Sequence, residues 1–199
     1  MVSAIVLAAG LSARMGSKNK MLLPFDGKTV IEKVVKNIVA SGIEDIIVVT
    51  GRDALQVHDL LQYSPVKIIH NDDFTRGMTT SIQKGVYSAN GNGYMICLGD
   101  MPFITSEEYK KLSDAFEQER LNDQACICIA VYQKQKGNPV VFSTHYKDMI
   151  LQHANMEGCK EIVQAHKQHL YPVEMPTVNV LTDIDTLADY EDALSYSLL

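Results

Sequence analysis

The chain has 199 residues, 46% of them hydrophobic, and a formal net charge of −6. This length fits a single domain with a proper core, which we expect over residues 1–199. The acidic balance argues against nucleic acid as a partner, because non-specific binding to it usually needs a basic face. No apolar run approaches the roughly 18 residues of a membrane span, and no basic leader precedes the first one, so we expect neither a membrane partner nor a signal peptide.

In the first half of the chain, apolar runs alternate with amphipathic stretches. Strands are expected at 3–9, 44–51, 66–71 and 94–100, and helices at 29–42, 53–62, 79–89 and 105–120. Thr29 with Glu32, and Thr105 with Glu108, have the spacing of capping boxes, and Gly42 is placed to end the first helix. This alternation predicts an α/β fold in three layers, with a mostly parallel central sheet and helices on both faces.

The second half is less regular. Strands are expected at 125–132 and 138–142, and helices at 143–153 and 157–169. Residues 171–175 and 178–181 could form short strands that add irregular or antiparallel edges. Asp185 or Thr186 is placed to cap a last helix that runs through Ser195.

The four cysteines, Cys97, Cys126, Cys128 and Cys159, form no C-x-x-C pair. We interpret them as buried thiols in a reducing compartment and expect a cytoplasmic protein. A zinc site would need closer clustering with histidine or acidic residues.

The loop after the first strand carries three cations, Arg14, Lys18 and Lys20. Ligands of parallel α/β folds gather at the carboxyl ends of the strands, where this loop lies. Gly10 and Gly16 allow close approach of the backbone, and the cations can hold phosphate oxygens. Neither a Walker A loop nor a G-x-G-x-x-G fingerprint is present. The loop therefore indicates a different kind of phosphate cradle, the alternative being an ordinary solvated loop.

Acidic residues follow two other apolar segments. Asp100 ends a predicted strand, where a carboxylate can face the ligand crevice, and Asp183 and Asp185 share one face if their segment is extended. Mg²⁺ bound to a triphosphate usually takes one or two carboxylates. Turn formation or helix capping is the alternative for all three aspartates.

The spacing L-A-A-G-x-x-x-R-M-G-x-x-x-K-x-L-L (residues 7–23) resembles the signature of the nucleotidyltransferases that handle molybdenum cofactor, the MobA-like NTP transferase family. Four further segments are similar to family motifs in the same order: GMTTSIQKG (77–85), LGDMP (98–102), GNPVVF (137–142) and DIDTLADY (183–190). In the last of these, Leu187 and Ala188 replace the usual Pro and Glu. The resemblance implies a Rossmann-like nucleotidyltransferase fold with an NTP-binding first half and an acceptor-binding second half.

Ala9, Met78 and Ser81 look like the cytidylyl branch of this family, whereas the distance from Arg14 to Lys20 is more like the guanylyl branch. The context KMLLP favours Lys20 over Lys18 as the functional lysine. The resemblance thus implies transfer of CMP from CTP to the phosphate of molybdopterin, with pyrophosphate as the second product.

The resemblance also implies roles for particular residues. Arg14 and Lys20 would be catalytic, and Asp100 and Asp185 would hold Mg²⁺, with Mn²⁺ as the other candidate. The nucleotide would contact Leu7, Ala8, Ala9, Gly10, Arg14, Lys20, Asn71, Gly77 and Ser81. Structural roles are the alternatives for Asn71 and Ser81, the latter as a hydroxyl at a helix N-terminus.

The implied partners are CTP and molybdenum cofactor, and a molybdenum hydroxylase apoenzyme would receive the product. Three other functions stay open. These are a guanylyltransferase of the same family, a nucleotidyltransferase acting on a sugar or alcohol phosphate, and a carrier that binds finished cofactor without catalysis.

Overall fold

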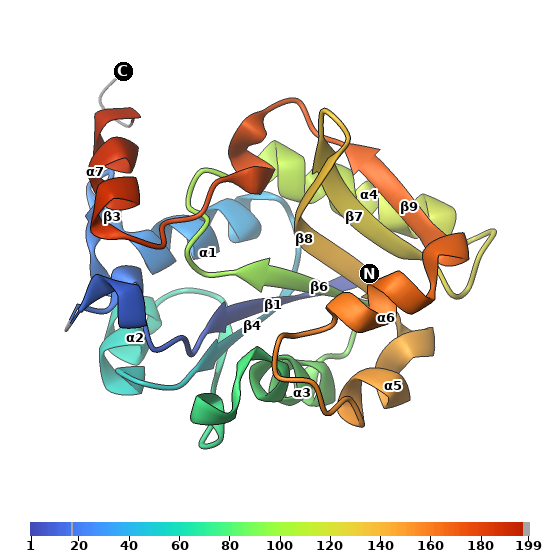
Figure 1. Cartoon of the computed structure of the whole chain (residues 1–199), viewed down its shortest axis with the longest axis horizontal. Helices are drawn as coiled ribbons and strands as arrows, with labels where there is room; N and C mark the ends of the chain where they lie inside the picture. Colours follow the sequence, from blue (N-terminus) through green and yellow to red (C-terminus); the bar gives the residue numbers. More distant parts are fainter. Residues whose placement is uncertain (17, 197–199) are drawn as a thin grey trace.

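The computed structural model describes residues 1–16 and 18–196. Within them a seven-stranded sheet has the order β5-β4-β1-β6-β8-β7-β9 (Figure 1). Its strands are β1 (Val2–Ala8), β4 (Asp45–Thr50), β5 (Lys67–His70), β6 (Gly93–Leu98), β7 (Ile127–Tyr132), β8 (Gln135–Ser143) and β9 (Leu170–Glu174). Pairing is parallel from β5 through β6 and again between β7 and β9. The mostly parallel sheet predicted from the sequence is confirmed.

The antiparallel element of this sheet is β8, which pairs with β6 on one side and with β7 on the other. It lies inside the sheet, and the late strand β9 is a parallel neighbour of β7. Of the two expectations for the late segments, irregular or antiparallel edges, the antiparallel one was therefore wrong. A short turn between β7 and β8 returns the chain directly, which requires antiparallel pairing.

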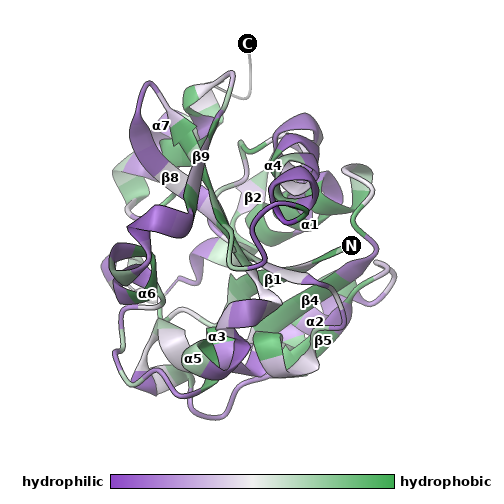
Figure 2. Cartoon of the chain, turned by 90° about the vertical axis from the view of Figure 1, so that its right-hand side faces the viewer, coloured by the Kyte–Doolittle hydropathy of each residue, from purple (hydrophilic) through white to green (hydrophobic). Residues whose placement is uncertain are grey.

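Helices cover both faces of the sheet (Figure 1). The alternation of side chains along β1 divides the core, since Ala4 and Val6 face one side and Ile5 and Leu7 the other. On the first face lie residues of α1 (Val30–Ala40), α2 (Ala54–Leu61) and α4 (Ser106–Glu119). On the second lie residues of α3 (Met78–Ser88), α5 (Lys147–Leu151) and α6 (Lys160–Ala165). Figure 2 shows the central strands largely hydrophobic and α4 largely hydrophilic, as expected for strands covered by amphipathic helices.

Several helix ends agree with the sequence. Thr29 with Glu32, and Thr105 with Glu108, form complete capping boxes at the starts of α1 and α4. The last helix, α7 (Leu187–Tyr196), follows Thr186, whose hydroxyl accepts from the Asp189 N–H while the Asp189 carboxylate accepts from the Thr186 N–H. Of the two predicted caps, Thr186 thus makes the capping contact, and Asp185 is free for another role.

Other short elements depart from the sequence predictions. Residues Val178–Leu181 form the 3₁₀ helix η6 and not a strand, because their backbone turns back on itself after Thr177. The helices expected at 143–153 and 157–169 are each divided, into η4 (Thr144–Tyr146) with α5, and α6 with η5 (Lys167–His169). The sequence reasoning also missed the hairpin of β2 (Pro24–Phe25) and β3 (Lys28–Thr29) around an Asp-Gly turn. The remaining 3₁₀ helices are η1 (Ala13–Met15), η2 (Lys20–Leu22) and η3 (Phe74–Arg76).

The direction of strand addition changes at β1. The chain moves from β1 to β4 and β5 on one side, and then returns to add β6 on the other. Loops diverge at the carboxyl ends of the strands at such a point and leave a crevice between them. None of the helices in the described part of the chain is long and apolar enough to cross a membrane.

Candidate active site

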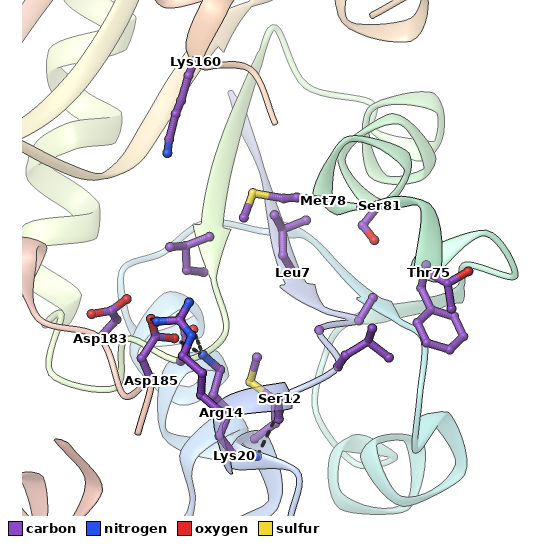
Figure 3. A pocket seen from close by; sticks show the side chains of 18 residues that line it. Leu7, Ser12, Arg14, Lys20, Thr75, Met78, Ser81, Lys160, Asp183 and Asp185 are labelled. Carbon is purple, nitrogen blue, oxygen red and sulfur yellow. Dashed lines mark hydrogen bonds and ion pairs between the residues drawn. The ribbon is translucent and has the colours of Figure 1, made fainter. Parts of the chain in front are cut away.

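A cavity of about 580 Å³ lies beyond the carboxyl end of β1 (Figure 3). Its wall combines the loop after β1, the start of α3, the end of β6 and the segment before α7. Most of the residues singled out in the sequence line it: Leu7, Ala9, Gly10, Arg14, Lys20, Gly77, Ser81, Asp100 and Asp185. The cavity therefore brings together segments that are far apart in the chain.

Polar contacts hold the loop after β1 in place. The Asn19 side chain accepts from the Met21 N–H and donates to Asp53 at 2.9 Å, while the Ser12 hydroxyl accepts from the Lys20 N–H. Ser12 has the left-handed backbone conformation (φ 50°). These contacts turn the chain so that Lys20 points into the cavity and is only 8% exposed.

Lys20 lies between two carboxylates. Its ammonium is 2.5 Å from an oxygen of Asp100 and 2.6 Å from one of Asp185. Arg14 approaches the other oxygen of Asp185 at 2.7 Å. Burial acts to lower the pKa of Lys20, but the charges and hydrogen bonds of Asp100 and Asp185 outweigh it and raise the pKa above its ordinary value. Lys20 is consequently a cation at any physiological pH.

Three carboxylates meet on this side of the cavity. Oxygens of Asp100, Asp183 and Asp185 lie within 4.8 Å of one another. The second oxygen of Asp100 is buried and has no hydrogen-bond partner. Partial desolvation at the cavity mouth, followed by the charges of Asp185 and Asp100, raises the pKa of Asp183. An unsatisfied buried carboxylate oxygen beside two further carboxylates fits a hard divalent cation such as Mg²⁺ or Mn²⁺. The sequence left Asp183 and Asp185 as alternatives, whereas the fold brings both to Asp100.

The two lysines weighed in the sequence lie in different surroundings. Lys18 is exposed and is not part of the cavity wall, whereas Lys20 is buried in it. Of these two lysines, the loop backbone thus places only Lys20 beside the carboxylates.

Two residues expected at the nucleotide lie behind the cavity wall. Ala8 is fully buried in the sheet. Asn71 is also fully buried, and its amide nitrogen donates to the hydroxyls of Thr80 and Ser81 at 2.9 and 3.0 Å. Asn71 therefore orients Ser81, which does line the cavity, at the start of α3.

One lining residue escaped the sequence reasoning. Lys160 is the first residue of α6, in the second half of the chain, and its side chain extends into the cavity (Figure 3). No motif marks it, because its position depends on the packing of residues 152–159 against α3. Only a three-dimensional contact could have found it.

A cationic loop at the switch point of a parallel sheet, facing Asp100 after the neighbouring strand β6, has the arrangement of an α/β protein that binds its ligand at the carboxyl ends of the strands. The chain belongs to the family of the MobA-like NTP transferase domain, whose model matches residues 4–170. It is a nucleotidyltransferase of that family.

Two of three named relatives cover nearly the whole chain, and the third covers 70% of it. A molybdenum cofactor cytidylyltransferase of Escherichia coli is 28% identical over 95% of this chain and 93% of its own length. A probable molybdenum cofactor guanylyltransferase of Methanosarcina acetivorans is 25% identical over 96% and 89%. A nicotine blue oxidoreductase of Paenarthrobacter nicotinovorans is 27% identical over 70% of both chains. Among solved structures, a nucleotidyl transferase from Methanothermobacter thermautotroptrophicus superposes with a TM-score of 0.85 at 26% identity and covers 100% of this chain and 98% of its own.

Proposed function

We propose that the protein transfers CMP from CTP to the phosphate of molybdopterin, giving molybdopterin cytosine dinucleotide and pyrophosphate. The observation that carries this proposal is the joint position of Arg14, Lys20 and Asp100 in one cavity. The choice of CTP is supported by Ala9, Met78 and Ser81, which lie on the cavity wall. The E. coli cytidylyltransferase also has the highest identity of the relatives named above.

In this proposal the nucleotide lies between the loop after β1 and the start of α3. Leu7, Ala9 and Gly10 line the base and ribose, and Gly77 and Ser81 close the opposite side. Arg14 and Lys20 bind the phosphates, the first with a planar fork and the second as a compact charge. Ala8 and Asn71 lie behind the cavity wall. Ala8 positions the backbone of the loop, and Asn71 orients Ser81.

Asp100 and Asp185, together with Asp183, would hold Mg²⁺, for which Mn²⁺ is the alternative. Such an ion would neutralise phosphate charge and supply a Lewis acid for a phosphoryl oxygen. The carboxylates would serve as oxygen ligands, and the unpartnered oxygen of Asp100 would gain the cation as its partner.

The reaction itself needs little from the protein beyond placement. A phosphate oxygen of the acceptor forms a bond to the α-phosphorus of CTP while the bond from that phosphorus to the bridging oxygen of the β-phosphate breaks. The electron pair leaves with pyrophosphate, whose charge Arg14 and Lys20 stabilise. The attacking phosphate is already ionised, because its second pKa is about 6, so no general base is required. Catalysis is then positioning and electrostatic stabilisation.

We further propose that the first half of the single domain binds the NTP and the second half the acceptor. The dinucleotide would then pass to a molybdenum hydroxylase apoenzyme. This division is supported by the position of Lys160, which enters the cavity from the second half.

The deciding experiment measures pyrophosphate release with molybdenum cofactor and Mg²⁺, with CTP, GTP, ATP and UTP supplied separately. Release with CTP alone is expected. Preference for GTP would move the protein to the guanylyl branch, which the Methanosarcina relative represents. Release only with a sugar or alcohol phosphate would change the acceptor. Tight dinucleotide binding with no release would identify a carrier.

A further inference from the structure

Lys160 occupies the end of the cavity opposite to the other cations. Figure 3 shows its side chain entering from α6 with the ammonium directed into the space, while Arg14 and Lys20 lie together at the far end beside Asp185. Arg14 and Lys20 are both paired with carboxylates. Lys160, in contrast, has no ion pair among residues 1–16 and 18–196. Of the three cations in the described cavity wall, only Lys160 has no carboxylate partner, and its ammonium is therefore available to an anion.

The position of Lys160 is set by contacts from the nucleotide side. The Thr79 hydroxyl of α3 donates to the Asn155 carbonyl oxygen and accepts from the Gly158 N–H at 3.0 Å. Gln83, one turn further along α3, donates to the carbonyl oxygens of Ile150, Leu151 and His153 at 3.0–3.1 Å. The segment before α6 is thereby tied to the helix that begins at the cavity.

Glycine is required where this segment crosses the start of α3. A Cβ on Gly77 would come within 2.6 Å of the Met156 carbonyl oxygen, and Gly77 has a φ of +102°. The close crossing of the two backbones leaves Lys160 directly after a tightly held turn. The fold therefore sets the backbone position from which the exposed side chain of Lys160 reaches the cavity.

The in-line geometry of phosphoryl transfer gives a specific role to an anion site at the Lys160 end of the cavity. The attacking and leaving oxygens lie roughly in line on opposite sides of the reacting phosphorus. In the proposed function, Arg14 and Lys20 hold the leaving pyrophosphate. The incoming phosphate must then approach from the opposite side, where Lys160 lies.

We propose that Lys160 binds the phosphomonoester of the acceptor and directs it at the α-phosphorus. This inference rests on the proposed function and deepens it, because it places the second substrate at a named side chain. The competing interpretation is that Lys160 binds the nucleotide and not the acceptor. The two roles differ in which substrate loses affinity when the charge is removed.

The test compares Lys160→Met with Lys160→Arg and with Lys167→Met, which removes a neighbouring exposed lysine that is not in the cavity wall. Two quantities are measured for each variant and for the wild type. The first is the KM for molybdenum cofactor and for CTP, each with the other substrate saturating. The second is the equilibrium dissociation constant of molybdenum cofactor with no nucleotide present, with inorganic phosphate as a competing probe.

For Lys160→Met we expect the acceptor KM and dissociation constant to rise about tenfold to hundredfold, as for loss of one charge-assisted hydrogen bond, with an unchanged KM for CTP. Lys160→Arg should restore most of the affinity, and Lys167→Met should match the wild type. Equal acceptor binding by Lys160→Met and Lys167→Met would overturn the inference, and so would a rise confined to the KM for CTP.

Failure of the proposed function has a different signature. A wild type that releases no pyrophosphate with any of the four nucleotides would remove the proposed function. The binding measurement still decides the role of Lys160 in that case. Weaker binding of molybdenum cofactor by Lys160→Met alone would support it, and equal binding by all variants would overturn it.

Discussion

The two halves of the sheet are built differently. In the parallel half, β1, β4 and β5 are each followed within a few residues by a helical element, and the loop directly after β1 supplies Arg14 and Lys20 to the cavity. In the other half, polar contacts between distant segments join α4 to η6 and β9 to the loop before β7. Buried Glu108 accepts from Thr177 and Asn179, and Asp123 accepts from Tyr171. Local sequence organises the first half, and distant carboxylate contacts organise the second.

This contrast predicts that substitutions in the cavity wall reduce catalysis, whereas those at the contacts between distant segments away from the cavity chiefly reduce stability. The largest effect is expected for Asp100→Ala, which removes a ligand for the ion and a partner of Lys20. Turnover should fall by at least about 10²–10³-fold, as for loss of one preorganised electrostatic contact. Mn²⁺ binding measured by electron paramagnetic resonance should weaken in parallel.

The matched control is Asp59→Ala, because Asp59 is an exposed carboxylate on α2 far from the cavity wall. It should keep both turnover and Mn²⁺ affinity. Normal Mn²⁺ binding by folded Asp100→Ala would contradict the assignment of the metal site.

Lys20→Ala should cost about 10²–10³ in turnover, or about 3–4 kcal/mol of transition-state stabilisation. Lys18→Ala provides the matched control, since Lys18 lies two residues away and is exposed. Pyrophosphate release and far-ultraviolet circular dichroism, measured on both variants, separate lost catalysis from lost folding. A larger effect at Lys18 than at Lys20 would reverse the assignment of the functional lysine.

Gly137→Ala probes the second half. A Cβ at this position in β8 would lie 2.1 Å from the Val180 carbonyl oxygen of η6, which precedes the aspartates of the cavity. The overlap should cost about 1–3 kcal/mol of unfolding free energy, measured by denaturant titration. Lys136→Ala, at an exposed neighbour in the same strand, should be close to neutral. Equal unfolding free energies for the two variants would show that η6 can shift freely.

The smallest expected effect is on the pH dependence of the protein's stability. Partial burial acts to raise the pKa of Asp123, but hydrogen bonds from His169, the Ala125 N–H and Tyr171 outweigh it and hold the pKa below its usual value. A depressed pKa gives stability that is present above the unfolded value, about 3.9, and is lost as the pH falls through the folded value. Asp123→Ala should therefore lose about 1 kcal/mol at pH 7, with a gap to the wild type that narrows toward pH 3. Thermal unfolding of both proteins at pH 7 and pH 3 measures this difference in stability. A difference that grows on acidification would contradict the predicted direction.

The contrast between the halves also explains what the sequence could predict. Thr29 with Glu32, and Thr105 with Glu108, are local signals, and both helix starts were predicted correctly. Asp100 was placed correctly at a strand end, because an apolar run followed by a turn locates that end within a residue or two. Such features depend on neighbours a few positions away.

Features that depend on distant contacts were missed. Residues 178–181 have strand-like side chains, but Thr177 and Asn179 are held by Glu108, and the backbone forms η6. The cluster of Asp183 with Asp185 and Asp100 could be proposed only as a choice between two aspartates. Lys160 had no local signal at all, since Thr79 and Gln83 determine where it lies.

The pairing of β6 with β8 joins the two halves through four residue pairs, from Gly93 with Ser143 to Ile96 with Val140. A sheet that is continuous across the boundary leaves no hinge about which two lobes could rotate. Substrates must then enter, and products must leave, through motion of the segments that border the cavity. Loop motions take nanoseconds to microseconds, whereas domain closure takes microseconds to milliseconds. The shared sheet thus predicts an enzyme whose gating is fast and confined to its rim.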